Sequence, residues 1–126
     1  MSKYFLMACL LGAAGHTFAG WTLLQETHDG ILYVDRDGAE KTGNGWRVDS
    51  SQDFHRQQVH EGKEYLSEKS RYEIDCGAKK IRTLSVERFP ENMAGGDLVH
   101  ADKKPGDWSV PAKGSSAEAI VNNLCR

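Results

Sequence analysis

The sequence has 126 residues, of which 39% are hydrophobic and 27% charged, which suits one small globular domain. Its formal net charge is −2 at pH 7, and both signs are spread along the chain. The basic stripe of a nucleic-acid-binding protein and a polybasic membrane patch are both missing, so the sequence predicts no nucleic-acid partner.

The first 19 residues have the order of a secretory signal peptide. Met1–Lys3 supplies a positive charge, Tyr4–Ala14 is almost wholly apolar, and Thr17–Ala19 ends with a small residue at each position that a signal peptidase recognises. The apolar run is shorter than the about 20 residues of a membrane-spanning helix. We therefore expect cleavage after Ala19, which leaves residues 20–126 as a single domain outside the cytoplasm, with no transmembrane segment.

A second processing route stays open. Leu6–Cys9 loosely resembles a bacterial lipobox, in which Cys9 would be lipidated and become the first residue. The apolar stretch before Cys9 is very short for a signal core, and it continues past Cys9 without a change of character. Cleavage after Ala19 is therefore the preferred prediction, and lipidation at Cys9 is the alternative.

The chain after the signal segment predicts short strands separated by turn residues. Trp21–Glu26 and Ile31–Asp35 are expected strands, joined by a hairpin turn at His28–Gly30. Trp46–Phe54 begins with an alternating pattern and is predicted to be a third strand. The polar residues 55–63 are expected to form an exposed connection.

Two longer strands and a short one are predicted next. Tyr65–Cys76 ends in strict alternation, Gly77 and Ala78 form a turn, and Lys79–Phe89 carries apolar residues in two phases. A last short strand is expected at Asp97–Ala101.

The C-terminal segment predicts one helix. Ser115 and Glu118 have capping-box spacing, and one apolar stripe follows at Ala117, Ile120, Val121 and Leu124. A helix this short is unstable alone in water, so it must dock on the sheet. The predicted fold class is α+β, with a six-stranded antiparallel sheet and one C-terminal helix packed against a face.

The cysteines indicate a disulfide. The sequence has three, and removal of the signal segment leaves Cys76 and Cys125. An even number in an oxidising compartment is expected to pair. Such a bridge would lock the helix to the strand that ends at Cys76.

Several motifs together form a wider pattern. They are Trp21, Tyr33–Asp35, Trp46–Val48, Ser70 with Cys76, Gly95–Val99, and the Trp108–Ser115 approach to a helix that carries Cys125. This pattern resembles the surface-adhesin protein E family of Gram-negative bacteria over essentially the whole chain after the signal segment. The resemblance implies an antiparallel sheet whose C-terminal helix is tied down by the Cys76–Cys125 bridge.

The resemblance also implies a function. It suggests an outer-membrane adhesin that binds host matrix and serum proteins such as vitronectin, laminin and plasminogen, and that can form a homodimer. We therefore expect an exported binding module in the periplasm, on the outer-membrane surface or outside the cell. The resemblance assigns no binding residue to this chain; the loop and strand residues themselves predict ligand contacts at His55, Arg56, His60, Lys63, Tyr65, Arg71 and Trp108. The alternative is a periplasmic inhibitor or envelope accessory protein without an adhesin role.

Catalytic and metal-binding patterns are weak in this sequence. A structural zinc ion usually takes four converging ligands, and His55 and His60 are badly spaced for this in a polar loop. With His28 and His100 they are expected to be solvent-exposed, so we predict no metal and no cofactor. No nucleophile elbow occurs and both mature cysteines are assigned to the bridge. The acid pairs Asp35/Asp37 and Glu68/Glu73 are expected to be solvated charges, and the protein is not predicted to be an enzyme.

The tryptophans are expected to differ in their roles. Trp21 and Trp46 begin predicted strands and should pack in the core. Trp108 is expected to pack beneath the start of the helix, with an exposed interface anchor as the alternative.

Overall fold

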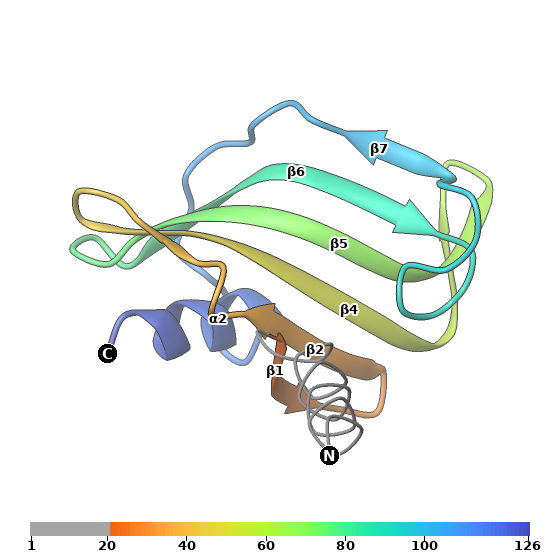
Figure 1. Ribbon diagram of the computed structural model, residues 1–126, viewed down its shortest axis with the longest axis horizontal. Helices are drawn as coiled ribbons and strands as arrows, with labels where there is room; N and C mark the ends of the chain where they lie inside the picture. The colour runs from red at the N-terminus through yellow and green to blue at the C-terminus, as the bar shows by residue number, and fades with distance from the viewer. Residues whose placement is uncertain (1–20) are drawn as a thin grey trace, which may run out of the picture.

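The computed structural model describes residues 21–126 and shows an antiparallel sheet with one C-terminal helix (Figure 1). The elements are β1 Trp21–Glu26, β2 Gly30–Asp35, β3 Glu40–Lys41, β4 Gly45–His60, β5 Lys63–Asp75, β6 Lys80–Phe89, β7 His100–Asp102 and α2 Ser116–Leu124. The strand order is β1-β2-β4-β5-β6-β7, and β3 pairs with β4. The α+β prediction is confirmed, and the short β3 makes the sheet seven-stranded.

The predicted signal segment lies outside the described residues, so cleavage after Ala19 and lipidation at Cys9 stay predictions. Among residues 21–126, no helix has the length and apolar character needed to cross a membrane.

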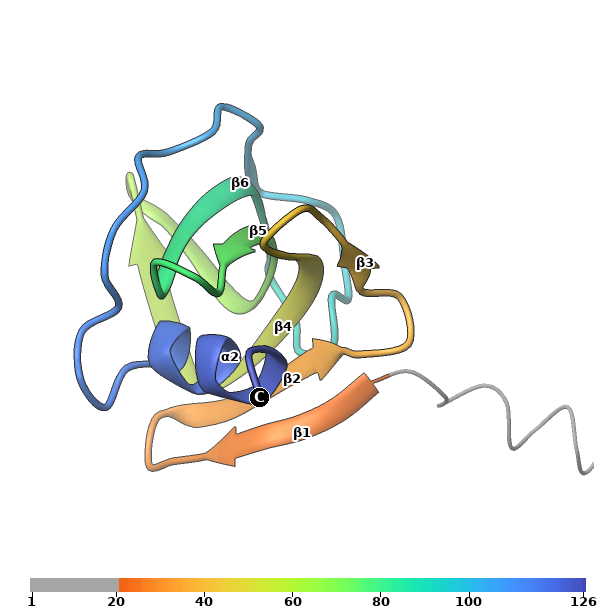
Figure 2. The same ribbon diagram turned by 90° about the vertical axis from the view of Figure 1, so that its left-hand side faces the viewer.

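The hydrophobic core lies between α2 and one end of the sheet. β2 alternates between buried and half-buried residues, as expected for a strand with one covered face. The core consists of Leu32, Val34, Val48, Ile74 and Ile81 from the sheet and Ile120 and Val121 from the helix. Figure 2 shows α2 against the inner side of the curved sheet. Burial of each such side chain contributes about 1.5–3 kcal/mol, which explains why so short a helix stays docked.

Both ends of α2 are fixed as the sequence predicts. The Ser115 Oγ accepts a hydrogen bond from the Glu118 backbone N at 3.2 Å. The Glu118 carboxylate accepts one from the Gly114 N at 2.9 Å, so it reaches one residue further back than in a standard capping box. The Cys76–Cys125 disulfide is present and ties the C-terminal end of α2 to the end of β5.

The polar segment 55–63 is largely exposed, as predicted, but it is a β-hairpin and not a connection outside the sheet, so that part of the prediction is wrong. β4 runs for 16 residues to His60, and β5 begins at Lys63. Only Glu61 and Gly62 form the turn, both with positive φ, at 51° and 78°, as a two-residue hairpin turn requires. The pairing register shifts between Asp53 and Gln58. This bulge interrupts the alternation that would identify the strand in the sequence.

Two further predictions need correction. The last strand is His100–Asp102, three residues later at its start than expected.

Trp21 lies on the edge strand β1 and is 39% exposed, because Leu24 is the β1 side chain that packs against the core. Trp46 is half-buried, with the Lys41 ammonium 4.8 Å from its ring centroid, and it lies outside the core cluster.

A row of polar side chains crosses the middle of the helix-covered face. Ser50 and Ser70 are buried there, and the Gln52 side chain donates to the Ser116 Oγ at 3.2 Å. Burial raises the pKa of the Tyr72 hydroxyl beside them, and hydrogen bonds from Ser70 and Ser50 partly offset that rise. The apolar core therefore stops at this row, and the far end of the sheet is stabilised by different contacts.

Candidate functional site

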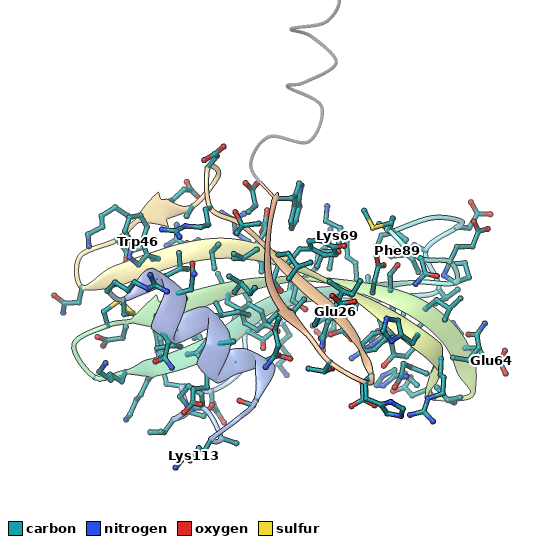
Figure 3. The ribbon with its side chains drawn as sticks, turned by 90° about the horizontal axis from the view of Figure 1, so that it is seen from below. Glu26, Trp46, Glu64, Lys69, Phe89 and Lys113 are labelled. Carbon is teal, nitrogen blue, oxygen red and sulfur yellow. A yellow bond between two sulfur atoms is a disulfide. The ribbon has the colours of Figure 1, made fainter. Side chains whose placement is uncertain are left out.

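The end of the sheet furthest from the disulfide gathers basic and aromatic side chains from four strands. We call His60, Lys63, Tyr65, Arg88 and His100 the hairpin-tip cluster; they come from β4, β5, β6 and β7. In Figure 3 this end carries the labelled Glu64, whereas α2 covers the opposite half, near Trp46. The antiparallel register brings these residues together, because β4 pairs with β5, β5 with β6 and β6 with β7.

Arg88 connects the members of the hairpin-tip cluster. Its Nε donates to the Glu68 carboxylate at 2.9 Å, and a terminal nitrogen lies 2.9 Å from the His100 Nδ1. Because a guanidinium has no acceptor, His100 Nδ1 must accept this hydrogen bond. The guanidinium also lies 5.2 Å from the centroid of the Tyr65 ring, within range of a cation–π contact. Arg88 and Glu68 are only 17% and 15% exposed, so their charges are held in place.

Further contacts link the tip of the β4–β5 hairpin to β7. The rings of His60 and His100 lie 4.4 Å apart between centroids. The His60 Nε2 is 3.6 Å from a Glu61 carboxylate oxygen. The Lys63 ammonium donates to the Val99 carbonyl at 3.2 Å. The hairpin and the chain leading into β7 therefore form one surface.

The loop between β6 and β7 packs against the same end of the sheet. Buried Asp53 accepts a hydrogen bond from the Met93 N at 2.7 Å, and buried Ser67 accepts one from the Ala94 N at 2.9 Å. Met93 and Ala94 both have positive φ, at 57° and 58°, a conformation that is uncommon without glycine. The Asn92 amide donates to the Phe54 carbonyl in the β4 bulge at 3.1 Å. These contacts hold the loop in one conformation.

A second polar surface lies on the sheet face opposite α2, because its residues alternate with the core positions along β4 and β5. Glu73 bonds Arg82 at 2.7 Å and Arg47 at 3.3 Å. The Arg82 hydrogen bond, supported by Arg47, lowers the pKa of Glu73, although partial burial opposes this. Arg71 pairs with Asp49 at 3.2 Å and also with Glu40. We call these six residues the ion-pair face.

The ion-pair face offers little free charge to a ligand. A shallow polar hollow of about 100 Å³ adjoins it, lined by Asp49, Lys69, Ser70, Arg71, Ser85 and Glu87. Each arginine of this face has a carboxylate partner within 3.3 Å. The face therefore stabilises the sheet, and it suits a binding role less well than the hairpin tip does.

The predicted ligand contacts fall into two groups. His60, Lys63 and Tyr65 come together in the hairpin-tip cluster, where Tyr65 is buried beneath Arg88 at 9% exposure. The other four are dispersed: His55 contacts the His28 carbonyl at 3.2 Å, Arg56 lies 3.5 Å from Asp29, Arg71 belongs to the ion-pair face and Trp108 lies near Arg82.

Three sequence-based expectations about side chains change. Trp108 is 40% exposed, and the Arg82 guanidinium lies 4.9 Å from its ring centroid, so it does not pack beneath the start of α2. His60 and His100 are half-buried instead of fully exposed. Sequence reasoning also missed Arg88, because its role depends on the strand register, which no local motif encodes.

The comparisons with known proteins give consistent results. One protein-family model, described as surface-adhesin protein E, matches residues 21–126. Crystal form II of Haemophilus influenzae protein E matches with a TM-score of 0.65 at 12% identity, covering 85% of this chain and 87% of that chain. Protein E from non-typeable Haemophilus influenzae matches with a TM-score of 0.60 at 12% identity, covering 85% of this chain and 76% of that chain. At such identity the structural likeness shows the fold alone. None of the curated proteins searched matches the sequence.

Proposed function

Because this chain belongs to the surface-adhesin protein E family, we propose that it is an exported adhesin that binds a host extracellular-matrix or serum protein. Proteins of the vitronectin, laminin and plasminogen class are the proposed ligands. The role is one of binding, without catalysis. The hairpin-tip cluster is the observation that supports binding at this particular surface.

The composition of the hairpin end supports a protein ligand. The hairpin end of the sheet also carries three exposed apolar side chains, which are Val59 on β4, Met93 in the anchored loop and Leu98 just before Val99. Met93 and Val59 are 67% and 65% exposed. Exposed apolar groups beside arginine and aromatic residues are typical of protein interfaces.

The geometry also supports binding with little rearrangement. Arg88 is fixed by Glu68, Tyr65 and His100, and the loop carrying Met93 is fixed by buried Asp53 and Ser67. Side chains held in place before binding lose less conformational entropy when the ligand arrives. A stable hairpin end is therefore better suited to a ligand than the exposed, singly bonded His55 and Arg56.

The test is surface plasmon resonance with the disulfide-bonded protein over immobilised vitronectin, laminin, plasminogen, lysozyme and albumin. We expect saturable binding to vitronectin, laminin or plasminogen, and none to the control protein albumin. The double variant His60→Ala/Lys63→Ala should weaken it about tenfold or more, as expected for residues that each contribute about 1 kcal/mol. Lys80→Ala is the matched control, since Lys80 is an exposed lysine at the disulfide end of the sheet.

The outcomes distinguish the candidate functions. Equal losses for both variants would contradict the assignment to the hairpin tip, because Lys80 lies at the other end of the sheet. Binding to lysozyme alone would contradict the adhesin role and favour a periplasmic inhibitor. Failure to bind any matrix or serum protein would also contradict the proposal.

A further inference from the structure

We propose that the hairpin tip also binds one divalent transition-metal ion of the zinc class, through His60, Glu61 and His100. Each of these residues offers one ligand atom, and the three atoms lie within 4.8 Å of one another. His60 and Glu61 belong to the β4–β5 hairpin, whereas His100 begins β7. Only the strand register brings them together, which is why the spacing of the histidines along the sequence gives no sign of the site.

The donor set fits zinc chemistry. Zinc binds imidazole nitrogens and carboxylate oxygens at about 2.0–2.2 Å, and sites with three protein ligands complete a tetrahedron with water. Ligand atoms in such a site lie about 3.4 Å apart, as the tetrahedral geometry requires. The His60 Nε2 and the Glu61 carboxylate oxygen are already 3.6 Å apart. Glu61 is 75% exposed in a turn, so its side chain is free to adjust, and the wider separation, within 4.8 Å, is the one to His100.

Hard oxygen-preferring ions fit this site less well. Calcium takes six to eight oxygen ligands and magnesium keeps several waters around a few carboxylates. Two imidazoles with one carboxylate instead suit zinc, copper, nickel or ferrous iron. The proposed ion is therefore a borderline transition metal, and zinc is the probe of choice because it has no redox chemistry of its own.

Arg88 competes with the metal for His100. Its guanidinium donates to the His100 Nδ1 at 2.9 Å, so in the neutral ring the other nitrogen carries the proton. A metal-bound imidazole needs the opposite arrangement, in which the free nitrogen donates to an acceptor. The metal must therefore either replace Arg88 at Nδ1 or bind the other nitrogen after Arg88 turns away. Arg88 keeps Glu68 and Tyr65 as partners in either case.

Metal binding would join the β4–β5 hairpin to the edge strand β7 by coordinate bonds, in addition to the contacts between their side chains. β7 has three residues, and the His60–His100 contact already spans from it to the hairpin. A bound ion would fix both histidines at once and stabilise the folded protein according to its concentration. Metal binding requires no host ligand, so it can be tested independently of the adhesin role.

The experiment is calorimetric titration of untagged, disulfide-bonded protein with Zn²⁺ after removal of metal by a chelator. We expect one ion per chain. His60→Ala and His100→Ala should each lower the zinc affinity by about tenfold or more. Loss of even a residue that only hydrogen-bonds to a metal ligand lowers metal affinity by about 10–100-fold. His55→Ala is the matched control, since His55 lies on the same strand and its ring Nδ1 lies 3.2 Å from the His28 carbonyl, outside the proposed metal site. Its affinity should equal that of the wild type.

A second variant tests the geometry without removing a ligand. Arg88→Gln replaces a pure donor by an amide whose oxygen can accept from His100, so zinc should bind more tightly than in the wild type. Arg82→Gln, on the same strand but in the ion-pair face, should leave the affinity unchanged. Circular dichroism of each metal-free variant confirms that it is folded. Co²⁺ should give the visible absorption of a tetrahedral site, and this should vanish in His100→Ala. Equal zinc affinity in the wild type, His60→Ala and His100→Ala would overturn the proposal, as would the absence of binding.

Discussion

Three arginines on β5 and β6 show how the partners of a residue determine what it does. Arg71 and Arg82 each face carboxylates across neighbouring strands, so their charges are compensated within the sheet. Arg88 has one carboxylate partner, Glu68, and turns its remaining donors and its flat face toward His100 and Tyr65. The same side chain therefore stabilises the sheet in one place and shapes a candidate binding surface in another.

The shifted carboxyl of Glu73 predicts a dependence of stability on pH. Because its pKa in the folded protein lies below the ordinary value of 4.5, the ionised form is favoured by folding. This contribution is complete above pH 4.5 and is lost as the pH falls through the lower folded pKa. In urea unfolding, Glu73→Gln should be less stable than the wild type at pH 7, and the difference should shrink below pH 4.5.

A matched variant controls for the general effect of acid. Glu64→Gln replaces an exposed carboxyl on the same strand, so its stability should follow that of the wild type at every pH. A constant difference between Glu73→Gln and the wild type across the acidic range would contradict the assignment of the shift to the Arg82 pair.

Elements whose sequence pattern depends only on near neighbours could be predicted. The α2 boundaries, its Ser115 cap and its apolar stripe follow from local spacing, and the disulfide follows from the cysteine count. The β4–β5 hairpin could not be predicted, because its polar residues are strand residues only through pairing and the bulge after Asp53 breaks their alternation. The candidate site could be predicted only in part for the same reason. His60 and Lys63 were among the predicted ligand contacts, whereas Arg88 joins them only through the register of β6.

The cap of α2 gives a prediction at the level of the element. Ser115→Ala removes the side-chain acceptor of the Glu118 N and should lower the free energy of unfolding by about 0.5–2 kcal/mol. Ser115→Asp keeps an acceptor and should stay close to the wild type. Equilibrium urea unfolding measures both. Equal losses for the two variants would mean that the hydroxyl acts through its own bond to the Ala112 carbonyl and not as a cap.

The molecule as a whole has two ends with different chemistry. One end contains the apolar core, α2 and the disulfide, and the other contains the hairpin-tip cluster and a loop held by buried Asp53 and Ser67. Figure 1 shows α2 and the β4–β5 turn at opposite ends of the long central strands. The long strands β4 and β5 therefore connect a stabilising end to the end that carries the candidate binding surface.

This division predicts how the protein responds to loss of its disulfide. The Cys76–Cys125 bridge spans a sequence separation of 49 residues, so the double variant Cys76→Ser/Cys125→Ser should lose up to about 4 kcal/mol of unfolding free energy. If the two ends unfold together, tyrosine and tryptophan fluorescence and far-ultraviolet circular dichroism will follow one urea transition that moves to lower concentration. Two separate transitions would contradict this and would mean that the hairpin end stays folded after α2 has detached. The long β4–β5 pairing, continuous from the core to the hairpin apart from its bulge, favours the single transition.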